Sequence, residues 1–199
     1  MGRIIAAALG FVAGFADAYG YIRWQAFGAN MTGNTIVFAV SLYRDARHAI
    51  FPLTLIVAFL LGAMLGRAIV ARFSPSIALV CEAVLLGAAA FVPNASALGV
   101  IALAMGIQNT AFATFAGVRA NTSFLSGDYT NLGRALADLV IRDKSDENPS
   151  AISILAPVIA AYVAGAVLAV FCRSSLVEVL VVVPIVLVIA YAASRRSVE

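Results

Sequence analysis

Charge is scarce in this sequence, and so are the side chains on which soluble enzymes depend. Of 199 residues, 12% are charged and 63% are hydrophobic, with one histidine, one tryptophan and two cysteines. A soluble globular domain is closer to about half apolar and a quarter charged. A chain of this length cannot hide such an excess in one core, because small domains leave much of their surface in water. The composition therefore excludes a soluble protein and predicts a chain that folds in lipid.

Patterns typical of catalysis, metal binding and nucleic-acid binding are also missing. The sequence contains no HExxH, GxSxG or P-loop motif, and its single histidine, His48, falls in a charged loop. Cys81 and Cys172 lie in or beside apolar runs without CxxC spacing, which is typical of buried thiols. The net charge of +3 comes from scattered basic residues, so we expect no nucleic-acid partner. We expect no catalytic residue, no metal and no cofactor, and hence no enzyme.

Long hydrophobic runs, by contrast, make up most of the chain. Six runs are apolar enough to cross about 30 Å of hydrocarbon, which takes roughly 20 helical residues. They are about Ile4–Ile22, Pro52–Arg72, Ile77–Val92, Leu98–Val118, Ile152–Phe171 and Leu176–Ala193. The sequence predicts an all-α integral membrane protein with about six transmembrane helices in a single transmembrane domain, residues 1–199. Its expected partner is the lipid bilayer.

Two further segments are too polar to face lipid along their whole length. Asn30–Tyr43 is only moderately apolar, and Asn121–Ile141 carries Asp128, Arg134 and Asp138. A charge at mid-membrane costs at least about 2.5 kcal/mol. We therefore expect two short or broken polar helices in addition to the six spans.

The two polar segments have similar openings, and similar motifs flank both. The first opens with Asn30-Met31-Thr32-Gly33-Asn34 and the second with Phe124-Leu125-Ser126-Gly127-Asp128. Upstream, Gly14-Phe15-Ala16-Asp17 aligns with Gly106-Ile107-Gln108-Asn109, and downstream Phe59–Gly62 aligns with Tyr162–Gly165. We therefore predict a tandem duplication, with repeat 1 at about residues 4–93 and repeat 2 at about 97–194.

The number of spans in each half sets the orientation of the repeats. A half with three spans and one non-spanning segment must sit upside down relative to its copy, which is a recurring plan in transporters. Placing both termini in the cytoplasm puts most of the 13 basic residues inside, in line with the positive-inside rule. Eight spans, with parallel repeats, are the alternative, and charge does not separate the two.

Four motifs keep their order and spacing over nearly the whole chain. They are Gly14-Phe15-Ala16-Asp17-Ala18, Asn30-Met31-Thr32-Gly33-Asn34, Gly106-Ile107-Gln108-Asn109 and Thr122-Ser123-Phe124-Leu125-Ser126-Gly127. Together they resemble the YoaK family of small bacterial inner-membrane proteins, which is classed as of unknown function. The resemblance implies a multi-pass protein of the bacterial inner (cytoplasmic) membrane. It implies no substrate.

The polar residues and glycines of these motifs are the candidates for a solute site or pathway. They are Asp17, Asn30, Thr32, Gly33, Asn34, Gln108, Asn109, Ser126, Gly127 and Asp128. Asp17 lies inside the first span, where a carboxylate must be protonated, paired or exposed to water. It is either a proton-coupling group or a structural partner for an arginine or for backbone N–H groups. Its counterpart Asn109 is uncharged, so at most one of the two positions titrates.

The two polar openings allow two interpretations. Hydroxyl, amide and carboxylate side chains can cap helix N-termini, and glycine permits a sharp turn into the helix. Alternatively, the two N-termini meet near the midplane and bind a solute, and their dipoles favour an anion, which Asp128 would oppose. Gln108 and Asn109 either line a pathway or form hydrogen bonds between helices.

Small residues and one further acid complete the pattern. Gly10 with Gly14, and Gly62 with Gly66, form GxxxG spacings that favour close helix packing within the chain or a homo-oligomer. Glu82, early in the third span, is expected to reach the interface or to pair with Arg67 or Arg72.

The sequence favours a transporter or channel for a small polar solute, with proton coupling as one option, and it does not name the solute. One alternative is a non-transporting membrane scaffold or accessory subunit, in which the polar residues only tie helices together. Another is an intramembrane hydrolase, which would need Asp17 and Asp128 within about one hydrogen bond of each other.

Overall fold

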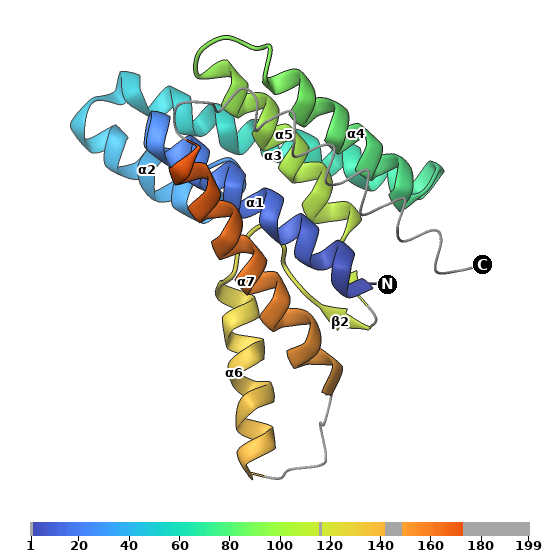
Figure 1. The fold of residues 1–199 in the computed structure, drawn as a ribbon. Helices are drawn as coiled ribbons and strands as arrows, with labels where there is room; N and C mark the ends of the chain where they lie inside the picture. The colour runs from blue at the N-terminus through green and yellow to red at the C-terminus, as the bar shows by residue number, and fades with distance from the viewer. Residues whose placement is uncertain (1, 116, 142–148, 173–199) are drawn as a thin grey trace.

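The computed structural model describes residues 2–115, 117–141 and 149–172, and the expected span at 176–193 lies outside them. The described chain is helical apart from one short β-hairpin (Figure 1). The elements are α1 (Gly2–Trp24), α2 (Met31–Arg44), α3 (Ala46–Arg72), α4 (Pro75–Ala89), α5 (Ser96–Ala111), β1 (Thr114–Phe115), β2 (Val118–Arg119), α6 (Ser126–Ile141) and α7 (Pro149–Phe171).

Three of these helices are long and apolar enough to cross a membrane, namely α1, α3 and the part of α7 from Ala151 to Phe171. The helices α4 and α5 are apolar but have only 15 and 16 residues. The outer face of α3 carries a row of exposed large apolar side chains, among them Leu53, Val57, Leu60 and Met64. Such a surface is compatible with contact to lipid and would be costly in water.

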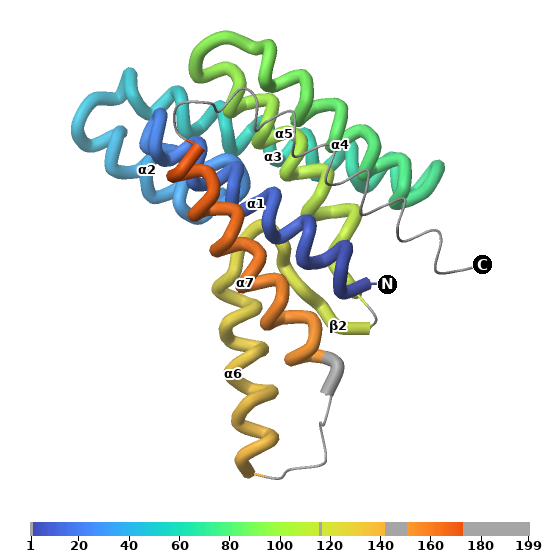
Figure 2. The backbone as a smooth tube through the Cα atoms, in the orientation of Figure 1, coloured from blue at the N-terminus to red at the C-terminus, as the bar shows by residue number. Residues whose placement is uncertain are grey.

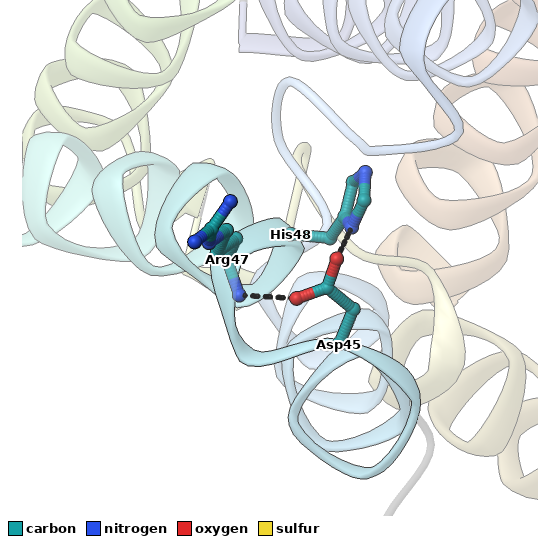
Figure 3. A network of polar contacts seen from close by, with 3 residues as sticks. All are labelled: Asp45, Arg47 and His48. Carbon is teal, nitrogen blue, oxygen red and sulfur yellow. Dashed lines mark hydrogen bonds and ion pairs between the residues drawn. The ribbon is translucent and has the colours of Figure 1, made fainter.

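Side-chain caps define where several helices begin. The Asn30 side chain accepts a hydrogen bond from the Gly33 N–H (3.0 Å) and so caps α2. Asp45 caps α3 by accepting from the Arg47 N–H (3.0 Å), and His48 Nδ1 lies 2.9 Å from the other Asp45 oxygen (Figure 3). His48 therefore belongs to the first turn of α3, and its assignment to a loop was wrong.

The end of the fourth apolar run also differs from the prediction. Helix α5 ends at Ala111, and an antiparallel hairpin follows in which Thr114 pairs with Arg119. Gly117 in its turn has φ +82°, a conformation that favours glycine. The expected helix up to Val118 is wrong, because hydrophobicity alone does not distinguish a helical end from a short buried strand.

Glycines let the helix backbones approach closely in two crossing pairs. A Cβ atom on Gly14 of α1 would overlap the Tyr162 carbonyl of α7, and one on Gly165 would overlap the Phe11 carbonyl. Gly10 also faces the α7 backbone. The prediction of close packing at this GxxxG spacing is confirmed.

The second pair consists of α3 and α5 and uses the same device. A Cβ atom on Gly62 of α3 would overlap the Leu103 carbonyl of α5, and one on Gly106 of α5 would overlap the Phe59 carbonyl. Gly66 faces the backbone of Ile107. The GxxxG spacing of α3 is therefore used within the chain as well.

The helices α1 and α5 run in opposite directions in the view of Figure 1, α1 from lower right to upper left and α5 from upper left to lower right. The helix α1 lies in the core, where Leu9, Val12 and Ala13 are buried. The helix α4 packs on α5, and α6 packs along α7 (Figure 2).

Candidate functional site

Asp17 ties the second half of α1 to the start of α2. Its Oδ1 atom accepts hydrogen bonds from the backbone N–H groups of Ala29 (2.6 Å) and Asn30 (2.9 Å). Its Oδ2 atom accepts from the Tyr162 hydroxyl of α7 (2.5 Å). Asp17 is buried and has no ion pair with any described residue. This geometry matches the structural alternative, in which the carboxylate holds backbone N–H groups at a helix start.

Asn34 anchors the turn that precedes α2. Its Oδ1 accepts from the Phe27 N–H, and its Nδ2 donates to the Phe27 carbonyl, both at 2.8 Å. The side chain is fully buried, so these two bonds replace water for the amide and for the backbone N–H and carbonyl of Phe27. Gly33 is needed beside it, because a Cβ atom there would lie 2.6 Å from the Phe27 ring.

The amides of α5 hold the segment that leads into α6. Gln108 Nε2 donates to Thr122 Oγ1 (2.7 Å) and to the Leu9 carbonyl of α1 (3.3 Å). Asn109 Oδ1 accepts from the Ser123 hydroxyl (2.7 Å). The structure thus places both amides in hydrogen bonds between segments, which is the commoner of the two expected uses.

Asp128 occupies a position in α6 like that of Asn34 in α2. Its Oδ1 accepts from the backbone N–H of Asn121 (2.9 Å), seven residues earlier, as Asn34 Oδ1 does from Phe27. The Asp128 side chain is buried, and its Oδ2 has no hydrogen-bond partner among the described residues. Burial raises the pKa of this carboxyl to about 6, although the bond from Asn121 lowers it.

The two halves carry an acid and an amide at equivalent positions, but in swapped order. In the first half the acid, Asp17, is on the long helix and the amide, Asn34, is on the short one. In the second half the amide, Asn109, is on α5 and the acid, Asp128, is on α6, and each of these helices has 16 residues. Each half therefore keeps one carboxylate and one amide to organise the start of its second helix, α2 or α6.

The first turns of α2 and α6 meet at a pocket of about 370 Å³, which α7 also lines. Its walls are Asn30, Thr32, Phe124, Leu125, Ser126, Tyr129 and Tyr162. Three of the candidate residues, Asn30, Thr32 and Ser126, line it directly. The other candidates do not line it, and Asp17 is one hydrogen bond away through Tyr162.

Sequence reasoning missed the aromatic part of this pocket. Tyr162 lies in the long apolar run of α7, and Tyr129 and Phe124 flank the opening of α6. A hydroxyl in an otherwise apolar helix was the available signal for Tyr162. It is weak, because tyrosine is also common in membrane helices as an interfacial residue.

Two larger pockets lie elsewhere in the described chain and are lined by none of the candidate residues. One of about 700 Å³ lies between the end of α1, with Tyr19, Arg23 and Trp24, and the turn after α4. Another of about 470 Å³ lies beside α2 and the first turn of α3, including His48. Neither contains a residue of the candidate set. Within the described ranges, no three His, Cys, Asp or Glu side chains cluster in a way that could hold a metal ion.

Glu82 differs from its expected placement. It is fully buried in α4, and neither carboxylate oxygen has a hydrogen-bond partner among residues 2–115, 117–141 and 149–172. The expectation that it reaches the interface was wrong, and it forms no ion pair with Arg67 or Arg72 in this part of the chain. Its side chain lies on the face of α4 that also buries Ala78, and not on the exposed face.

Comparison with known proteins gives one family. A family model described as a protein of unknown function (DUF1275) matches residues 5–194, so the chain belongs to this family. No curated protein and no solved structure matches the chain. The narrower likeness to the YoaK family remains an expectation from the sequence motifs.

Proposed function

We propose that this member of the DUF1275 family is a transporter or channel for a small polar solute, which binds in the pocket between α2, α6 and α7. The meeting of two polar helix openings at one pocket is the observation that most supports this proposal. Polar side chains on its wall are those of Asn30, Thr32, Ser126, Tyr129 and Tyr162. Small-molecule sites commonly combine an apolar wall with a few convergent polar groups.

We further propose that residues 4–93 and 97–194 form inverted repeats. The close contacts between helices support this reading. Gly14 of the first repeat faces the Tyr162 carbonyl of the second, and Gly106, which aligns with Gly14, faces the carbonyl of Phe59, which aligns with Tyr162. The acid and the amide also change places between the repeats, since Asp17 and Asn34 align with Asn109 and Asp128. The helices α1 and α5 run in opposite directions in Figure 1, which fits inverted repeats as well. In transporters built this way, the solute site lies at the repeat interface, beside the ends of interrupted helices.

The membrane topology is part of the proposal. Six spans with both termini in the cytoplasm fit the distribution of basic residues, and the bacterial inner membrane is inferred from the sequence motifs. We assign no enzymatic step. Asp17 and Asp128 form hydrogen bonds to different segments, and neither bonds to the other among the described contacts. A homo-oligomer through the GxxxG faces is not favoured, because these glycines already contact helices of the same chain.

The test begins with purified protein in detergent and a thermal-shift screen of amino acids, small sugars, polyols and inorganic anions. A solute that binds the folded state raises Tm, and the stabilisation grows with the logarithm of one plus its concentration over Kd. Solutes that raise Tm are then followed into proteoliposomes. We expect Thr32→Val and Ser126→Ala to reduce both the thermal shift and the flux.

Thr54→Val is the matched control for Thr32→Val. Thr54 is exposed on α3, its hydroxyl donates to the Ile50 carbonyl within the same helix, and it lies outside the pocket. Flux should survive this change. If no solute shifts Tm and the wild-type protein conducts none of them, the scaffold or accessory-subunit alternative replaces the transport proposal.

A further inference from the structure

Asn34 and Asp128 both accept a hydrogen bond from a backbone N–H seven residues earlier, but one side chain is an amide and the other a carboxyl group. Asn34 meets both backbone polar groups of Phe27, accepting from its N–H and donating to its carbonyl. Asp128 accepts from the N–H of Asn121, at the same spacing of seven residues and with a similar length, 2.9 Å against 2.8 Å. The second atom of the Asn34 amide is a donor, whereas the second atom of an ionised Asp128 can only accept.

The second oxygen of Asp128 is therefore the unusual feature of this site. It is buried, and no described residue donates to it. An ionised carboxylate with a buried, unpaired oxygen is strongly unfavourable, whereas a protonated one supplies an O–H donor. A protonated Asp128 has the same hydrogen-bonding pattern as Asn34, with one acceptor atom and one donor atom.

We propose that Asp128 is a proton-binding site at the pocket, held as a carboxylic acid whose Oδ2–H donates to the Asn121 carbonyl as Asn34 Nδ2–H donates to Phe27. Release of the proton to water leaves a carboxylate oxygen facing that carbonyl, so the bond between the start of α6 and the Asn121 segment weakens. Since Ser126 and Tyr129 of the same turn line the pocket, protonation of Asp128 sets the position of the pocket wall.

Asp17 is the other buried acid near the pocket, and its surroundings differ. Three hydrogen-bond donors, the N–H groups of Ala29 and Asn30 and the hydroxyl of Tyr162, satisfy both of its oxygens. These donors occupy both Asp17 oxygens, whereas the Asp128 Oδ2 has no donor among the described residues. Proton binding, one of the two alternatives that the sequence allows for Asp17, is thus assigned to Asp128 instead.

Few other charged groups are near enough to alter this assignment. The helix α7, which packs along α6, contributes one titratable side chain, Tyr162. On α6 itself there are Tyr129, Arg134 and Asp138, and Arg134 is exposed. Arg119 of β2, the nearest basic residue before the segment, is exposed as well. None of them forms an ion pair with Asp128 within the described ranges.

Infrared difference spectroscopy of the purified protein tests the proton directly. Spectra taken at about pH 5 and about pH 8 report the carbonyl stretch of protonated carboxyl groups, and an acid of raised pKa titrates between these values. We expect a band in the wild-type protein that is lost in Asp128→Asn and retained in Asp17→Asn. The comparison is made in a Glu82→Gln background, because Glu82 is another buried acid without a partner among the described residues. In that background, a titrating band that persists in Asp128→Asn, or one that disappears only in Asp17→Asn, would overturn the proposal.

Substitutions that interchange the acid and the amide at positions 128 and 34 give a second, independent test. Asp128→Asn should fold and keep its Tm, because the amide supplies the donor that the acid is proposed to supply. Asn34→Asp should create a second titrating carboxyl band and lower Tm at about pH 8 more than at about pH 5. An Asp128→Asn protein that fails to fold would contradict the inference, because the proposed donor is present in that variant.

The role of this proton in solute movement rests on the proposed function, and the two can fail separately. If Asp128 titrates as expected but no solute binds or crosses the membrane, the proton site stands and transport falls. If solute flux is found but is equally pH-dependent in the wild-type protein and in Asp128→Asn, transport stands and the proton site falls.

Discussion

The hydroxyl of Tyr162 on α7 donates to Asp17 on α1, and the same tyrosine lines the pocket where α2 and α6 begin. One side chain thus joins the structural network of the first half to the surface that a solute would meet. The residue aligned with it in α3 is Phe59, which has no hydroxyl. The bond therefore has no counterpart at the Phe59 position.

Tyr162→Phe removes one of the three donors to the buried Asp17 carboxylate. The loss should lower the free energy of unfolding by about 1–3 kcal/mol, as expected when a buried charged acceptor loses a partner. Thermal unfolding in detergent measures it. Tyr129→Phe is the control, because Tyr129 lines the same pocket but forms no hydrogen bond with Asp17. Equal losses in the two variants would show that the Asp17 bond is not the cause.

Gly14→Ala places a methyl group against the Tyr162 carbonyl, at the crossing of α1 and α7. Because backbone atoms cannot move aside cheaply, we expect a loss of about 1–3 kcal/mol, as for other overpacked sites. Gly99→Ala in α5 is the matched control, since no atom lies within 4 Å of its added Cβ. The gain in helix propensity should make the control neutral or up to about 1 kcal/mol more stable. A neutral Gly14→Ala would contradict the close crossing.

Glu82→Gln tests whether the buried acid of α4 is neutral. An unpaired carboxylate in an apolar site is costly, so we expect the wild-type group to be protonated and the amide to replace it with a change below about 1 kcal/mol. Glu82→Leu should be neutral or stabilising for the same reason. Thermal unfolding of both variants is the measurement. A loss of several kcal/mol in the glutamine variant would mean that the carboxylate is ionised and paired.

Asp128 contributes to the pH dependence of stability. Its pKa in the folded protein is about 6, above the ordinary value of 3.8, so the folded state binds the proton more tightly than the unfolded state does. The resulting stabilisation is complete below the ordinary pKa and is lost as the pH rises through about 6. Tm of the wild-type protein should fall over this interval. Asp128→Asn should show a smaller fall, and an identical fall would assign the effect to another group.

Hydrophobic runs located most of the helices, but not all of their ends. The runs at 4–22, 52–72 and 152–171 correspond to α1, α3 and α7, because a long apolar segment has few alternatives to a helix. The end of α5 was misplaced by several residues, since the strand residues Phe115 and Val118 are as apolar as the helix before them. Helix caps such as Asp45 extended α3 further toward the N-terminus than hydropathy indicated.

The pocket could be anticipated in part. Asn30, Thr32 and Ser126 were identified because a polar opening in an apolar context needs partners. Tyr162 could not be, because its role depends on the crossing of α1 and α7, which brings together residues 145 positions apart. Glu82 was misjudged for a related reason. Position along a helix gives the depth of a side chain, but packing decides which face is covered.

The crossing pairs also mean that neither half of the chain completes its own interior. The helix α1 needs α7 to cover its glycine face, and α5 needs α3, so these two helix crossings of the described chain join residues from opposite sides of the turn at 90–95. Cut at that turn, each fragment would leave an uncovered stripe of glycines and carbonyl groups. The two fragments made together should recombine into one molecule, whereas either made alone should be degraded, and synthesis of the second half thus completes the fold of the first.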